Sequence, residues 1–88
     1  MQRRDLTIRN RLGLHARAAA KLVSLCSRYS SHVVVFANGR RADGRRMIAL
    51  LALSAAMGAQ IAIEVSGPDE SEAVVAVTRL ISDGFGER

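Results

Sequence analysis

Aromatic residues and cysteines are scarce in this 88-residue sequence. It contains no tryptophan, one tyrosine, two phenylalanines and one cysteine, Cys26. A single thiol cannot close an internal disulfide, and with only two histidines beside it the chain cannot complete a structural zinc site. We therefore expect a reduced protein that holds no metal and no cofactor, with a core packed by Ala, Val, Leu and Ile.

Long hydrophobic runs are also missing. Residues 1–10 are charged and lack the apolar segment of a signal peptide, and the longest apolar run, residues 47–57, is too short to cross a bilayer. The sequence therefore predicts a cytoplasmic protein without an export signal or a membrane span. Its 49% hydrophobic and 24% charged residues are an ordinary globular mixture, which predicts one folded domain over residues 1–88.

Acidic residues are few in the first half of the chain. The whole sequence has 13 basic and 8 acidic residues and a formal net charge of +5. Residues 1–46 hold eleven basic and two acidic side chains, whereas residues 47–88 hold two basic and six acidic ones. A basic half of this kind favours an anionic partner, which could be a nucleic acid, a phosphoryl group or an acidic protein surface.

Hydrophobic periodicity and the placement of Gly, Pro and Asn divide the chain into seven short elements. The predicted strands span residues 6–9, 31–37, 40–42 and 60–66, with a hairpin turn at Asn38-Gly39. The predicted helices span residues 16–28, residues 46–53 and the stretch from Pro68 to Gly84. The order βαββαβα predicts an α+β sandwich of one sheet with helices on one face.

The longer elements each have a predicted inner and outer face. The first helix should bury Ala16, Ala19, Ala20, Leu22, Val23 and Cys26, with its basic side toward water. The strand at 60–66 should point Ile61, Ile63 and Val65 inward and Ala62 and Glu64 outward. The last helix should bury Ala73, Val74, Val77, Leu80 and Ile81, and Asp69, Glu70 and Glu72 in its first turn should complement the helix dipole.

One short segment carries residues suited to chemistry. His15 stands where the first helix should have its N-cap, a position that Ser, Thr, Asp or Asn fill more readily. The N-terminus of a helix offers unpaired backbone N–H groups and a partial positive charge, which bind anions and oppose protonation of a nearby imidazole. The sequence therefore predicts a neutral, nucleophilic histidine at this position.

Arg17 follows two residues later on the polar face of the same helix. Its planar guanidinium can hold phosphate oxygens in a fork, so the pair is suited to a phosphorylated histidine. A unit charge pair at ~4 Å gains about 1 kcal/mol in water and about 4 kcal/mol at an intermediate dielectric, enough to hold the group without trapping it. The plainer alternative is an exposed loop histidine beside a solvated helix face, and the neighbouring Gly13, Arg17 and Lys21 weigh against it.

The segment around His15, NRLGLHARAAAKLV, resembles the active-site segment of HPr, the histidine-containing phosphocarrier family of the bacterial phosphotransferase system. NGRRADGRRMIALLAL and AAMGAQIAIEVSGPDESEAVVAVTRLI extend the resemblance over nearly the whole chain, toward proteobacterial HPr and its nitrogen-branch relative NPr. The resemblance implies an open-faced β-sandwich, in which three helices cover one face of a four-stranded antiparallel sheet.

The resemblance also implies a function. Enzyme I, charged by phosphoenolpyruvate, would pass a phosphoryl group to Nδ1 of His15, which would hand it to a IIA domain. Arg17 would steady the group together with the backbone amides that open the first helix, those of Ala16, Arg17 and Ala18. We expect a monomeric carrier rather than an enzyme, with no second acid or base near His15.

Two positions differ from the commonest family pattern. Ala18 stands where proline often follows the active-site arginine, and it restores a backbone N–H that can donate to an anion. Arg46 stands where many relatives have the serine modified by HPr kinase/phosphorylase. Without that hydroxyl, we expect this regulatory branch to be absent.

The second helix is the expected docking surface for partners. Its apolar centre is expected at Met47, Ile48 and Leu51, with Met47 and Ile48 exposed and with Leu50 and Leu53 in the core. A basic rim is expected from Arg11, Arg17, Lys21, Arg45 and Arg46, which would suit an acidic partner. His32 is expected to face solvent, and Cys26 to be buried and inert.

Two other functions are compatible with parts of this sequence. A basic nucleic-acid-binding module is supported by charge alone, because the strands lack stacking aromatics and the chain lacks a helix-turn-helix or zinc pattern. A signalling relative that binds regulators without relaying phosphate would not need His15 and Arg17. The residues therefore favour the phosphocarrier.

Overall fold

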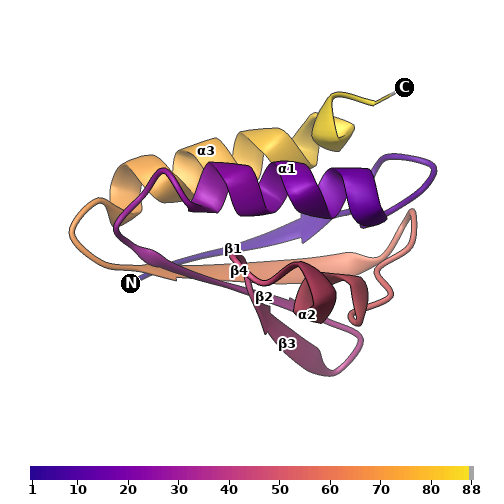
Figure 1. The fold of residues 1–88 in the computed structure, drawn as a ribbon, viewed down its shortest axis with the longest axis horizontal. Coiled ribbons are helices and arrows are strands. Elements are labelled where there is room, and N and C mark those ends of the chain that lie inside the picture. Colours follow the sequence, from indigo (N-terminus) through magenta and orange to yellow (C-terminus); the bar gives the residue numbers. More distant parts are fainter. Residues whose placement is uncertain (88) are drawn as a thin grey trace.

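Four strands and three helices follow one another in the predicted order. The structure is a computed structural model that describes residues 1–87 (Figure 1). The elements are β1 Gln2–Thr7, α1 Ala16–Cys26, β2 His32–Ala37, β3 Arg40–Asp43, α2 Met47–Leu51, β4 Gln60–Ser66 and α3 Glu70–Ser82, followed by a 3-10 turn at Gly84–Gly86. Among residues 1–87, no helix is long and apolar enough to cross a membrane.

The strands form one antiparallel sheet in the order β1-β4-β2-β3. Figure 1 shows α1 and α3 side by side on one face of this sheet, with α2 near β3, while no helix of residues 1–87 covers the other face. The predicted open-faced α+β architecture is confirmed.

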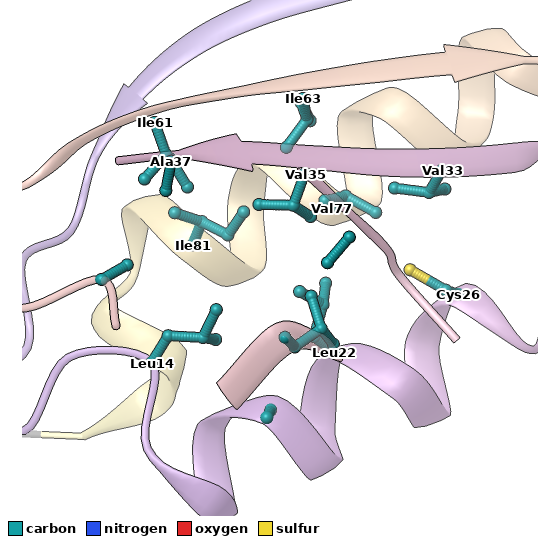
Figure 2. Packing of buried hydrophobic residues seen from close by; sticks show 14 of the residues in the cluster. Leu14, Leu22, Cys26, Val33, Val35, Ala37, Ile61, Ile63, Val77 and Ile81 are labelled. Atoms are coloured by element: carbon teal, nitrogen blue, oxygen red, sulfur yellow. The ribbon is translucent and has the colours of Figure 1, made fainter. Parts of the chain in front are cut away.

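Small aliphatic side chains fill the space between the sheet and the helices, as predicted (Figure 2). The register places Val35 of β2 opposite Ile63 of β4, and both are fully buried under Val77 and Ile81 of α3. Phe85 of the C-terminal turn is the one aromatic side chain buried below 2% exposure among residues 1–87.

The inner face of α1 differs from the prediction. Ala18, Ala19, Leu22 and Cys26 are buried, Val23 is half-buried, and Ala16 and Ala20 are exposed. The buried stripe is rotated about the helix axis relative to the prediction, because α1 packs against α2 as well as α3. This packing brings Ala18 inward. The helix ends at Cys26 rather than Arg28, since the following residues make tighter turns, with Tyr29 N–H donating to the Cys26 carbonyl.

The start of α3 and the outer face of β4 also differ from the prediction. Asp69 precedes α3, and its carboxylate accepts hydrogen bonds from the backbone N–H groups of Ser30 and Ser31 rather than from the helix. Leu80 is half-buried, whereas the other predicted α3 core residues are buried. Ala62 lies on the open face but is only 6% exposed, because Asp5 and Phe36 flank it across the neighbouring strands.

The short helix α2 is held mainly at its C-terminal end. Its N-cap, Arg46, makes no side-chain capping bond. Beyond the helix, Asn38 Nδ2 donates to the carbonyls of Leu53 (2.8 Å) and Ser54 (3.2 Å), groups that a helix end otherwise leaves without partners. The β2–β3 hairpin therefore fixes the place of α2.

Candidate functional site

His15 is the N-cap of α1, as predicted. Its backbone is extended, with φ −82° and ψ −179°, and its carbonyl accepts the N–H of Ala19 at 2.8 Å. Its Nδ1 accepts the N–H of Arg17 at 3.4 Å. The imidazole therefore takes the place of the oxygen that usually caps a helix, and Nδ1 faces the positive end of the helix dipole.

The loop before His15 is positioned by a close approach between two backbone segments. Leu14 N–H donates to the carbonyl of Ala55 at 2.8 Å. Gly13 has φ +63°, and a Cβ at this position would lie 2.4 Å from the same carbonyl oxygen. A side chain at Gly13 would therefore displace the loop that presents His15.

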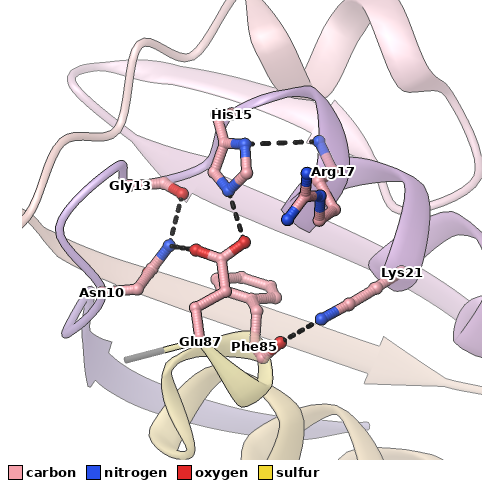
Figure 3. A network of polar contacts seen from close by, with 7 residues as sticks. All are labelled: Asn10, Gly13, His15, Arg17, Lys21, Phe85 and Glu87. Carbon is pink, nitrogen blue, oxygen red and sulfur yellow. Dashed lines mark hydrogen bonds and ion pairs between the residues drawn. The ribbon is translucent and has the colours of Figure 1, made fainter.

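A carboxylate from the end of the chain completes the site. His15 Nε2 and Glu87 Oε2 are 2.6 Å apart (Figure 3), and both side chains are largely buried. The expectation of no second acid or base near His15 is therefore wrong. The two residues lie 72 positions apart in the sequence, so helical or strand spacing gave no sign of their contact.

Glu87 is held in place by contacts on both sides. Asn10, which is 4% exposed, donates from Nδ2 to Glu87 Oε1 at 2.9 Å and to the carbonyl of Gly13 at 2.8 Å. Lys21 Nζ donates to the carbonyl of Phe85 at 2.6 Å, and Phe85 anchors the turn in the core. The two glycines that flank Phe85 were the only sequence sign of a tight turn just before Glu87.

These contacts assign the tautomer of His15. The hydrogen bond from Asn10 is the main cause that holds the pKa of Glu87 below its ordinary value, and the contact with His15 acts in the same direction. Glu87 is therefore an acceptor at neutral pH, so the ring proton lies on Nε2. Nδ1, which faces a backbone N–H donor, keeps its lone pair.

A basic hollow adjoins the imidazole. It has a volume of about 480 Å³ and is lined by Arg11, Leu12, Arg17, Lys21, Gly86 and Glu87. Figure 3 shows the guanidinium of Arg17 beside His15 and Glu87. Three of the predicted cations thus line one hollow with Glu87, and their charge exceeds that of its one carboxylate.

The predicted docking residues are only partly as expected. Ile48 is 82% exposed and Leu51 is 37% exposed, whereas Leu50 and Leu53 are buried, all as predicted. Met47 is instead half-buried and packs against the core, so it adds little to the exposed surface.

Arg45 is exposed just before α2, and its guanidinium donates to the carbonyls of Cys26 and Tyr29, at the end of α1 that is remote from His15. His32 is exposed, as predicted, and lies 3.9 Å from Asp43. Cys26 is fully buried, and burial raises the pKa of its thiol to about 11.

Comparison with known proteins shows the family to which the chain belongs. The family model described as "PTS HPr component phosphorylation site" matches residues 2–83. The chain belongs to the HPr family. It is 45% identical over 87 residues to the phosphocarrier protein HPr of Cupriavidus necator, a match that covers 99% of this chain and 98% of the relative.

Other HPr-family proteins agree in sequence and in structure. The phosphocarrier protein NPr of Escherichia coli K12 is 41% identical over 86 residues, covering 97% of this chain and 96% of that protein. The crystal structure of an HPr from Thermoanaerobacter tengcongensis superposes with a TM-score of 0.94 at 32% identity, covering 100% of this chain and 99% of the other. The protein is thus a phosphocarrier of the phosphotransferase system, and the nucleic-acid-binding alternative finds no support.

Proposed function

We propose that this HPr-family protein accepts a phosphoryl group on Nδ1 of His15 from phosphoenolpyruvate-charged enzyme I and passes it to a IIA domain. The observation that carries the proposal is the division of roles between the two ring nitrogens. Nε2 is engaged by Glu87 at 2.6 Å, while Nδ1 keeps its lone pair at the N-terminus of α1. Only Nδ1 is then available as a nucleophile.

The transfer balances without a further proton carrier. The Nδ1 lone pair leaves its weak hydrogen bond with the Arg17 N–H and forms the bond to phosphorus as the bond between phosphorus and the donor breaks, and the ring keeps its proton on Nε2. The ring gains positive charge as the bond forms, and the carboxylate of Glu87 opposes this charge directly. Transfer to the next partner reverses these changes.

The phosphoryl oxygens would be held by the groups that surround Nδ1. Arg17 supplies a guanidinium, and the N–H groups of Ala16, Arg17 and Ala18 lie in the first turn of α1. Glu87 opposes this attraction, because its negative charge lies in the same hollow. A balance of this kind stabilises a phosphohistidine that remains labile enough to be passed on.

The partner would dock on the surface beside this hollow. Ile48 and Leu51 of α2 expose apolar side chains, and Arg11, Lys21 and Arg46 are exposed cations. An apolar centre with a basic rim suits a partner with an acidic rim, which would also speed encounter at low salt.

Position 46 separates this protein from relatives that are regulated there by phosphorylation. Arg46 has no hydroxyl and precedes α2 without capping it. We infer that an HPr kinase/phosphorylase would leave the protein unmodified. Incubation with such a kinase and ATP should give no phosphoserine, and modification at the nearby exposed Ser54 would contradict this inference.

The test of the main proposal is phosphorylation with purified enzyme I and phosphoenolpyruvate, followed by intact-mass spectrometry. The native protein should gain one acid-labile phosphate, and His15→Ala should gain none. His32→Ala is the matched control, because it removes the other histidine, and it should be phosphorylated normally. A native protein that stays unmodified, or a His15→Ala variant that still gains phosphate, would overturn the proposal.

A further inference from the structure

Asn10 lies where the loop that presents His15 meets the turn that precedes Glu87. Its side chain is only 4% exposed, and Gly84 of the C-terminal turn lies against it, since a Cβ at Gly84 would be 3.6 Å from the Asn10 Cβ. The loop follows β1 and the turn follows α3, so the two segments are far apart in the sequence. Asn10 is therefore enclosed between the two parts of the chain that meet at the His15 ring.

Both N–H groups of the Asn10 side-chain amide are used. Nδ2 donates to the carbonyl of Gly13 at 2.8 Å and to Glu87 Oε1 at 2.9 Å, as Figure 3 shows. The backbone carbonyl of Asn10 accepts the N–H of Gly13 at 3.1 Å, so residues 10–13 form a turn that is closed by two hydrogen bonds. One amide group thus holds both the loop before His15 and the carboxylate that contacts its ring.

The oxygen of the same amide shows that its donors determine its orientation. Asn10 Oδ1 is buried and has no hydrogen-bond partner among residues 1–87. Exchanging the positions of Oδ1 and Nδ2 would place the oxygen against the Gly13 carbonyl and the Glu87 carboxylate, which are both acceptors. A buried acceptor without a partner costs free energy, so the two donated bonds must offset that cost.

We propose that Asn10 is a positioning residue for phosphoryl transfer, which acts on His15 through Glu87. The inference rests on the proposed function, because it concerns the same histidine. With Oε1 held by Asn10, the Glu87 carboxylate presents Oε2 to His15 Nε2 at 2.6 Å. Without that bond, the carboxylate would be free to turn toward the guanidinium groups of Arg11 and Arg17 in the same hollow.

The first test does not involve phosphoryl transfer. In the full chain labelled with ¹⁵N-histidine, the Nε2–H proton of His15 should give a visible NMR signal, because its hydrogen bond to Glu87 slows exchange with water. Asn10→Ala should broaden or remove this signal, as Glu87→Ala should.

Asn10→Asp is a second variant of nearly the same shape. It has no side-chain N–H to donate, and its carboxylate would repel that of Glu87, so it should also remove the Nε2–H signal. Gln60→Glu is the matched control, because it makes the same change from amide to carboxylate at an exposed position of β4. It should leave the signal unchanged.

The second test measures the rate constant for transfer from phosphorylated enzyme I. Because Asn10 acts through Glu87, Asn10→Ala should slow transfer by no more than Glu87→Ala does. We expect about tenfold, the scale found when the side chain that orients a metal-binding histidine is removed. Adding Asn10→Ala to Glu87→Ala should cause no further loss, whereas independent effects would multiply. A merely structural role would lower the stability of Asn10→Ala without this dependence on Glu87.

The proposal is overturned if the native protein lacks a protected Nε2–H signal, or if both Asn10 variants keep it. It is also overturned if Asn10→Ala slows the Glu87→Ala variant by the same factor as the native protein, or if Gln60→Glu acts like Asn10→Asp. A native protein that enzyme I does not phosphorylate would contradict the proposed function of His15, and the Nε2–H signal would still decide whether Asn10 positions the ring.

Discussion

His15 is placed by the start of α1, but its ring is oriented by residues from other parts of the chain. Glu87 comes from the C-terminal turn, and Asn10 holds Glu87 from the loop after β1. For metal-binding histidines, removal of the side chain that orients the second ring nitrogen commonly changes activity about 10- to 100-fold. We expect a similar scale for Glu87, which acts on Nδ1 through the far side of the ring.

Glu87→Gln tests this role at the residue scale. Glutamine keeps the size and an acceptor oxygen but removes the charge that opposes the positive ring, so transfer from phosphorylated enzyme I should slow about tenfold. Rapid-quench measurement of the rate constant would show it. Asp83→Asn removes an exposed carboxylate just before the same turn and should leave the rate unchanged. Equal rates for Glu87→Gln and the native protein would exclude the proposed role.

Cys26 should be unreactive in the native protein. Burial raises the pKa of its thiol to about 11, so it is protonated at neutral pH and shielded from reagents. Iodoacetamide should leave the folded protein unmodified and should alkylate it once after unfolding in guanidinium chloride, as read by mass spectrometry. Rapid alkylation of the folded protein would show that the packing of Cys26 against the segment at Gly44 opens readily.

At the scale of the elements, α2 depends on the β2–β3 hairpin more than on its own sequence. It has five residues, too few to be stable alone, and its N-cap makes no side-chain bond. Asn38 supplies the missing partners at the other end and adopts φ +53° in the turn. The surface that presents Ile48 and Leu51 therefore depends on a residue outside it.

Asn38→Gly should reduce the free energy of unfolding by about 1–2 kcal/mol, because glycine tolerates the positive φ but leaves the carbonyls of Leu53 and Ser54 without their donor. Asn38→Ala should cost more, since alanine adds backbone strain to the same loss. Urea unfolding followed by circular dichroism measures both. If Asn38→Gly is as stable as the native protein, the hairpin does not hold α2.

Most elements could be predicted because their signals are local, but the first strand was predicted at residues 6–9 and lies at Gln2–Thr7, where charged residues hide the alternation. The alternation of Ile61, Ile63 and Val65 gave β4 its observed bounds, and Asn38-Gly39 gave the hairpin. The predicted exposure of Met47 was wrong, because the burial of this side chain is set by contacts with elements that packing brings together. Glu87 was missed for the same reason, since its position depends on a turn that closes onto α1.

At the scale of the whole molecule, two half-buried carboxylates, those of Asp69 and Glu87, tie distant segments together. The side-chain hydrogen bond from Ser31 is the main cause that lowers the pKa of Asp69. The side-chain hydrogen bond from Asn10 is likewise the main cause that lowers the pKa of Glu87. A carboxylate whose pKa is lower in the folded state stabilises the fold above its unfolded pKa. That stabilisation is lost as the pH falls through the folded pKa.

The urea midpoint should therefore be constant near neutral pH and should fall as the solution is acidified below the ordinary pKa values of these groups, 4.5 for Glu87 and 3.8 for Asp69. Asp69→Asn should lower the midpoint at neutral pH and flatten its decrease in acid. The exposed Asp83 provides the control, and Asp83→Asn should reproduce the native profile. An Asp69→Asn profile parallel to the native one would show that Asp69 does not link these segments.

The protein thus presents a basic hollow at the start of α1 and, elsewhere, an uncovered sheet face. The proposed phosphoryl transfer depends on the hollow. The most direct measurement is ³¹P and ¹⁵N NMR of the protein labelled with ¹⁵N-histidine and phosphorylated by enzyme I and phosphoenolpyruvate. We expect phosphorus bonded to Nδ1 of His15, with the proton kept on Nε2. Phosphorus on Nε2, or on any residue other than His15, would contradict it.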